Sequence, residues 1–296
     1  MKMKYYIVGL ALFVIGFSAC SQKEDITPSL VGQQINASFV VGDAQTRVNT
    51  LDKSANKWED GDKIKAEVTG GGKTTESVLM ATVSEDGSVS WSHHKNFVWS
   101  GWGQHQIRVS YPSDYAYDAK THIWTLPIGQ NSLNGLKSAD YIGGSWKNEP
   151  WNYITIPVAH RLALVTVEYE IGSADFTEGA TLENPVVISP YPKFSLGMDD
   201  KVYGTGDVAE VKAYRHENAN KFSAIIVPGT RDSGIEFLNF SVGGKNYKSS
   251  LKTPTEFEGG HCYTYNLKIG KNKVELTQIK VEEGGLPGWT TEEELK

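Results

Sequence analysis

Apolar and polar residues alternate along most of this chain, and that period of two constrains its fold more than any other feature. Every second residue from 35 to 41 is apolar: Ile35, Ala37, Phe39 and Val41. Successive side chains of a strand point to opposite faces, so this pattern predicts a half-buried strand. No stretch keeps apolar residues at the helical period of 3.6 over three turns. The chain is therefore predicted to be all-β.

Similar patterns predict many more short strands. They cover residues 63–68, 77–83, 88–91, 106–111, 122–126, 153–158, 161–171, 185–189, 208–214, 221–227, 235–242, 245–248, 261–269 and 273–281. Glycine-rich and polar turns separate them, as is typical of β-sandwiches, and about fourteen strands fill two sandwiches better than one. In the last strand the apolar parity changes after Leu276, which predicts a β-bulge near Thr277 and Gln278 or a change of buried face.

A length of 296 residues is about twice that of a typical domain. We expect a signal peptide at 1–19, a tether at 20–34, an N-terminal β-sandwich at 35–150 and a C-terminal β-sandwich with an acidic tail at 151–296. The boundary is placed near Glu149 and Pro150, where the sequence is typical of a loop.

The N-terminus carries the features of an exported protein. Lys2 and Lys4 precede an apolar run from 5 to 17, which is too short for a permanent transmembrane helix. The run ends in Phe17-Ser18-Ala19-Cys20, which resembles the lipobox of bacterial lipoproteins, although leucine is usual where Phe17 stands. In that family the signal is cut before the cysteine and its thiol receives an acyl chain such as palmitate. The alternative is an ordinary secretory signal in which Cys20 is incidental.

The residues that follow Cys20 are polar and charged: Ser21-Gln22-Lys23-Glu24-Asp25. They resemble the signal that sends some lipoproteins of the Bacteroidales type to the outer leaflet of the outer membrane, and a solvated linker is the alternative. If Cys20 is acylated, the remaining cysteine, Cys262, has no partner for an intramolecular disulfide.

Charge and motif content exclude several function classes. A net charge of -6 argues against nucleic acid as a partner, because phosphate binding requires clustered Lys and Arg. No nucleophile with a base, phosphate loop or set of metal ligands at a suitable spacing is present, and the adjacent His93 and His94 would point to opposite faces of a strand. We therefore expect no catalysis, no metal and no cofactor.

One stretch is crowded with aromatic residues: Trp91, Trp99, Trp102, Tyr111, Tyr115, Tyr117 and Trp124. Exposed coplanar rings can stack on sugars, so Trp99 and Trp102 are candidate glycan-binding residues of a surface lipoprotein. The alternative is that these rings pack in or along a sheet, as aromatic residues in strands usually do.

Four blocks resemble the fimbrillin family, the FimA-like and Mfa-like pilins of Bacteroidales. The blocks are Thr46-Arg47 followed by Trp58-Glu59-Asp60-Gly61-Asp62-Lys63-Ile64, Pro157-Val158-Ala159-His160-Arg161-Leu162-Ala163, Ile225-Ile226-Val227-Pro228, and Gly259-Gly260-His261-Cys262-Tyr263-Thr264-Tyr265-Asn266-Leu267. They occur in the family's order across most of residues 35 to 281.

This resemblance implies two transthyretin-like antiparallel β-sandwiches in tandem and a fimbrial subunit at the cell surface. In the family's polymerising members an Arg-specific protease removes the lipidated N-terminal segment with the first strand, and a neighbouring subunit supplies a replacement strand. Arg47 is the candidate cleavage site, and an exposed loop arginine is the alternative. The implied partners are other fimbrial subunits, the outer membrane through the lipid, and host or bacterial glycans or proteins.

The C-terminal segment departs from the regular apolar strand of stalk pilins. Leu286, Pro287, Gly288 and Trp289 lie among acidic residues, and proline cannot donate to a ladder. The role as stalk, tip, accessory or anchor subunit is therefore open.

Overall fold

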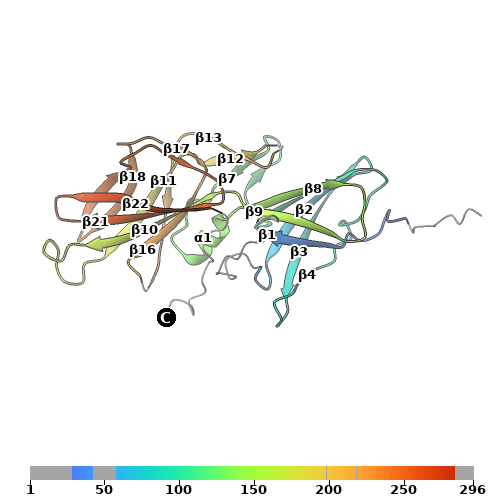
Figure 1. The fold of residues 1–296 in the computed structure, drawn as a ribbon, viewed down its shortest axis with the longest axis horizontal. Coiled ribbons are helices and arrows are strands. Elements are labelled where there is room, and N and C mark those ends of the chain that lie inside the picture. Colours follow the sequence, from blue (N-terminus) through green and yellow to red (C-terminus); the bar gives the residue numbers. More distant parts are fainter. Residues whose placement is uncertain (1–28, 43–57, 198, 218, 284–296) are drawn as a thin grey trace, which may run out of the picture.

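The computed structural model describes residues 29–42, 58–197, 199–217 and 219–283. Almost all of their regular structure is β, which confirms the all-β prediction. Within these ranges there is one helix, α1 (Leu133–Ala139), which begins after Ser132, whose hydroxyl accepts a hydrogen bond from the Gly135 amide at 3.1 Å. No helix among the described residues is long and apolar enough to cross a membrane. Figure 1 shows two lobes that lie end to end along the long axis.

The first lobe is built on one seven-stranded sheet with the order β1-β9-β8-β5-β2-β3-β4. Its strands are β1 (Ala37–Val41), β2 (Lys63–Gly70), β3 (Lys73–Val83), β4 (Val89–Trp91), β5 (His105–Tyr111), β8 (Ile142–Asn148) and β9 (Ile154–His160). The sheet encloses a core of its own, which includes Phe39, Trp58, Ile64, Phe97, Trp99, Ile107 and Ile156. Phe39, Ile64, Ile107 and Ile156 come from predicted strands, whereas the aromatic residues Trp58, Phe97 and Trp99 come from the segments between strands.

The second lobe contains four smaller sheets around a larger core. Their orders are β15-β16-β10-β21-β22, β14-β11-β18-β19, β13-β12-β7-β6 and β17-β20. The strands are β6 (Tyr117–Asp118), β7 (Ile123–Thr125), β10 (Ala163–Ile171), β11 (Leu182–Ser189), β12 (Lys193–Leu196), β13 (Val202–Thr205), β14 (Ala209–Lys212), β15 (Tyr214–Arg215), β16 (Lys221–Ile226), β17 (Gly229–Arg231), β18 (Glu236–Val242), β19 (Lys245–Ser250), β20 (Thr255–Phe257), β21 (His261–Ile269) and β22 (Val274–Glu283).

Two pairs of the described strands are parallel, so these sheets are mixed and not purely antiparallel as predicted. β1 runs parallel to β9, and β10 runs parallel to β21. Parallel neighbours need a long connection, and in both pairs the two strands are far apart in the sequence. Alternation within a strand carries no information on the direction of its neighbour, which is why the sequence pattern could not distinguish the two arrangements.

Within the described residues, the chain passes between the two cores three times. After β5 it leaves the first core, and the following excursion, residues 112–141, places Tyr115, Leu126, Leu136, Ala139 and Tyr141 in the second core. It returns at Ile142, which belongs to the first core, and passes over again between Val158 and Leu162. The predicted domain boundary at residue 150 stays a prediction, and β9 beyond it lies in the sheet of the first lobe.

The excursion interrupts what would otherwise be a β-hairpin. β5 and β8 are antiparallel neighbours, and Tyr111 at the end of β5 is the register partner of Ile142 at the start of β8. The excursion is therefore an insertion between two paired strand ends, and it supplies α1, β6 and β7 to the second lobe.

The last strand contains the bulge that its sequence predicts. Thr264 pairs with Lys280 and Tyr265 pairs with Gln278, so Ile279 is the extra residue. Leu276 before the bulge is buried, whereas Ile279 is exposed. A bulge breaks the strict alternation of faces, which accounts for the change of parity.

Candidate functional site

The predicted site residues fall into two groups. Cys20 and Arg47 lie outside the described residues. Trp99 is only 1% exposed and packs against the rings of His105 and Trp146, whereas Trp102 is 76% exposed. A buried ring cannot stack on a ligand, so Trp99 is a core residue and the two tryptophans do not form a shared binding face. Alternation could not reveal this burial, because both residues lie outside the regular strands.

The first structural candidate is the edge strand β1. Its five residues pair with β9 from Ala37 opposite Ile154 to Val41 opposite Val158, and β9 is its only sheet neighbour among the described strands. A strand at the edge of a sheet is held on one side alone, so it is the part of the sheet most easily replaced by another chain.

β1 also closes the first core. Phe39 is 4% exposed and its ring lies edge-on to the Trp91 ring, with the centroids 5.0 Å apart. The Trp58 indole N–H donates a hydrogen bond to the Phe39 carbonyl oxygen at 2.8 Å. Removing β1 would therefore open an apolar groove along β9 and leave the Trp58 indole without this acceptor.

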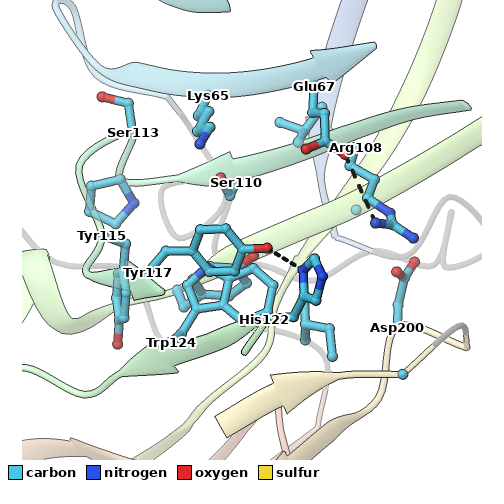
Figure 2. Close-up of a pocket in the computed structure, with 16 residues that line it drawn as sticks. Lys65, Glu67, Arg108, Ser110, Ser113, Tyr115, Tyr117, His122, Trp124 and Asp200 are labelled. Atoms are coloured by element: carbon cyan, nitrogen blue, oxygen red, sulfur yellow. Dashed lines mark hydrogen bonds and ion pairs between the residues drawn. The ribbon is translucent and has the colours of Figure 1, made fainter. Parts of the chain in front are cut away.

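The second candidate, which the sequence analysis did not identify, is a cavity between the two lobes. We call this cavity of about 430 Å³ the junction cavity. One wall is the outer face of β2, β5 and β8, and the other is the sheet that contains β6, β7 and β12 (Figure 2). Its volume lies in the range of small-ligand sites.

Aromatic rings of the second lobe form one side of the junction cavity. The Tyr117 ring lies on the Trp124 ring with centroids 4.5 Å apart, and Trp124 in turn stacks on the buried Phe194. Lys65 reaches over from β2 and places its ammonium 5.7 Å from the centre of the Tyr117 ring (Figure 2). Burial raises the pKa of Tyr141, which lines the cavity, far above its usual range, so its hydroxyl stays neutral.

Polar side chains surround these rings. The Tyr117 hydroxyl is hydrogen-bonded to His122 Nδ1 at 2.6 Å, as Figure 2 shows. Glu67 and Arg108, on β2 and β5, form an ion pair at 3.9 Å, and Asp200 lies on the opposite side. His122 and Asp200 have positive φ angles of 56° and 60°, a conformation that His and Asp adopt more readily than most residues. These turns direct both side chains toward the cavity.

Asp200 is fixed in turn by the first lobe. Its carboxylate accepts a hydrogen bond from the Ser145 hydroxyl at 3.1 Å and lies 3.6 Å from the Arg161 guanidinium. Ser145 belongs to β8 and Asp200 to the turn after β12, so this contact joins the two lobes beside the junction cavity.

A buried ionisable pair lies where the chain changes lobes. His160 Nδ1 is 2.9 Å from the Asp140 carboxylate, and both side chains are almost fully buried. Next to this pair, the Arg161 amide donates to the Tyr141 carbonyl and its guanidinium donates to the Gly143 carbonyl, both at 2.9 Å. The His-containing block of the sequence therefore has a structural role: its hydrogen bonds link two passages of the chain.

Comparison with known protein families identifies the family of this chain. A family model described as fimbrillin-like matches residues 46–283. The chain belongs to the fimbrillin-like family. This match includes all four sequence blocks and confirms the predicted resemblance, and it supports a role for this fimbrillin-like protein as a subunit of fimbriae at the cell surface.

Solved structures share the fold of this fimbrillin-like protein. A putative cell adhesion protein from Bacteroides uniformis matches with a TM-score of 0.58 at 18% identity, covering 83% of this chain and 96% of that chain. One from Bacteroides ovatus matches with a TM-score of 0.61 at 15% identity, covering 86% and 98%. One from Bacteroides fragilis matches with a TM-score of 0.50 at 16% identity, covering 83% and 97%. A search of curated protein sequences found no significant match.

The described part of this fimbrillin-like protein offers little for metal chemistry. It contains no group of three or more His, Cys, Asp or Glu side chains arranged to hold an ion. Cys262 is 1% exposed, and burial raises the pKa of its thiol, so the reactive thiolate is disfavoured. The predicted absence of catalysis stays a prediction.

Proposed function

We propose that this protein is a fimbrial subunit that is exported as an outer-membrane lipoprotein, with the acyl chain on Cys20. Cleavage after Arg47 then removes residues 20–47 together with β1, and a strand from another subunit takes the vacated position beside β9. Partners are copies of this chain or other fimbrial subunits, and the role is structural and adhesive.

The observation that carries this proposal is the position of β1. The strand is at a sheet edge, has five paired residues and contributes Phe39 to the core. A replacement strand must supply the same two things, which are backbone hydrogen bonds to β9 and an apolar side chain beside Trp58 and Trp91. Arg47 follows β1 by six residues of sequence, so a cut there releases this strand and leaves β2 and the rest of the lobe intact.

Incubation of the purified mature protein with an Arg-specific protease tests the proposal. We expect one early cut after Arg47, release of the N-terminal fragment, and ladders on a denaturant-free gel with filaments in the electron microscope. Replacing Arg47 with Ala should prevent both the cut and the assembly. A synthetic peptide of residues 35–42, added in excess, should suppress assembly by reoccupying the groove, whereas the same peptide with Asp in place of Phe39 should not.

Resistance of the wild-type chain to the protease, or clean cutting after Arg47 with no assembly at any concentration, would contradict strand addition. The family assignment would still hold, because it rests on the sequence match alone.

A further inference from the structure

We propose that the junction cavity binds a neutral saccharide, with the sugar ring against Tyr117 and its hydroxyl groups hydrogen-bonded to the surrounding charged side chains. This inference does not depend on strand addition. It assigns an adhesive site to the space between the lobes, away from the β1 groove.

The aromatic side of the cavity suits the C–H face of a sugar. Tyr117 is half-buried and packs at a tilt of 34° against Trp124, which is itself stacked on Phe194. A ring fixed in this way presents a rigid apolar surface and loses little conformational entropy on binding. Lys65 stands over part of the ring, but its ammonium is already paired with Glu76 at 2.9 Å. A sugar can therefore displace it toward an existing partner.

The polar groups suit hydroxyls more than ions. Two cations, Lys65 and Arg108, face the cavity together with two anions, Glu67 and Asp200, so the formal charges of these four side chains cancel. Both donors and acceptors line the cavity, and adjacent hydroxyls of a sugar can donate to a carboxylate and accept from a guanidinium. An anionic ligand would be attracted by the two cations and repelled by the two anions, and a cationic ligand would meet the reverse.

The cavity is also preorganised on both sides. Asp200 is held by Ser145 and lies close to Arg161, and the Tyr117 hydroxyl is held by His122. Because the polar groups are already ordered, binding requires little further immobilisation of side chains. The wall residues come from six strands and the turns beside them, and for this reason no motif in the sequence marks the site.

Saturation-transfer difference NMR of the mature protein tests the inference. The probes are the methyl glycosides of glucose, galactose, mannose, fucose and N-acetylglucosamine, with galacturonic acid as a charged probe. We expect at least one neutral glycoside to receive saturation, with a Kd on the order of 1 mM for a single sugar unit. Replacing Tyr117 with Ala should weaken binding at least tenfold, and replacing Trp102, which lies outside the cavity, should leave it unchanged.

A second variant controls for the case in which the Tyr117 variant fails to fold. Arg108 is 59% exposed in its side chain, so Arg108→Ala should keep the fold and still weaken binding severalfold. The inference is overturned if no neutral glycoside receives saturation, if galacturonic acid binds more tightly than every neutral probe, or if the signal survives both Tyr117→Ala and Arg108→Ala.

Discussion

The surroundings of His216 disfavour its charged form. Its ring packs 4.8 Å from the Tyr214 ring, and its Nε2 lies 2.9 Å from the Ser223 hydroxyl oxygen. Burial, aided by the charge of Lys221, lowers its pKa to about 4 from an ordinary value of 6.5. The neutral ring is therefore part of the folded state of the second lobe.

We predict that His216 makes the fold acid-sensitive between pH 6.5 and 4. As the pH falls through this window, the unfolded chain binds a proton on His216 before the folded chain does, so the free energy of unfolding decreases. The stabilisation that the neutral His216 ring contributes to the fold is present in full only above pH 6.5. Urea unfolding at several pH values should show a steeper decline for the wild type than for His216→Gln. Parallel pH profiles for the two proteins would contradict the assignment, since carboxylates that titrate below this range affect both equally.

At single residues, sequence reasoning succeeded where one position determines its own environment. The large apolar Trp58 is 7% exposed, and Gly61, which belongs to the same sequence block, has a φ of 86° that favours glycine there. It failed for Trp99, and it could not identify Glu67 or Asp200 as cavity residues. The surroundings of these three residues depend on which distant segments of the chain pack together, and a local sequence pattern does not contain that information.

The elements differ in how clearly the sequence marks them. Strands with strict alternation, such as β2 and β21, were predicted within a few residues, whereas β8 was not. β8 contains Gly143 and Gly144, and a Cβ on Gly144 would collide with the Pro157 carbonyl oxygen of neighbouring β9. The close approach of two strands requires glycine there, and glycine removes the apolar signal on which strand prediction depends.

Our element-scale prediction is that Phe39→Ala loosens β1 without unfolding the protein. Truncating a buried phenylalanine costs about 3 kcal/mol, and β1 can separate locally because it has a single neighbour in the described sheet. Hydrogen exchange of the β1 amides should accelerate on the order of 100-fold, while that of β5 amides stays unchanged.

Val40→Ala is the matched control, because Val40 lies in the same strand and is 45% exposed. It should leave the exchange of β1 amides near the wild-type rate. Equal protection of β1 in the Phe39 and Val40 variants would mean that Phe39 does not hold the strand in place.

For the whole molecule, the insertion between β5 and β8 leads to a prediction about independent folding. Joining Tyr111 to Ile142 by Asn-Gly in a fragment of residues 29–159 would restore a tight hairpin between register partners. We expect this fragment to fold alone, with dispersed amide NMR signals. The same fragment with the excursion kept should bind a hydrophobic dye, because Leu126, Leu136 and Tyr141 lose the core that buries them.

If the joined fragment stays unfolded, the first core depends on the second and the two lobes are one folding unit. No local pattern in the sequence indicates that the segment between β5 and β8 packs in the second core. The sequence shows where strands begin and end, but the placement of a segment in one core or the other is set by packing between elements that are distant along the chain. Tyr115 and Phe194, for example, have ring centres only 6.0 Å apart.

The three passages of the chain between the lobes have a mechanical consequence. Tension along a fimbrium acts on each subunit within it. In a chain with a single linker, that one segment would carry the whole tension between the lobes. Here the passages after β5, before β8 and after β9 act in parallel, and the contacts of Asp140 with His160 and of Ser145 with Asp200 lie beside them. Pulling the lobes apart must therefore stretch all three connecting segments together and break these contacts at the same time.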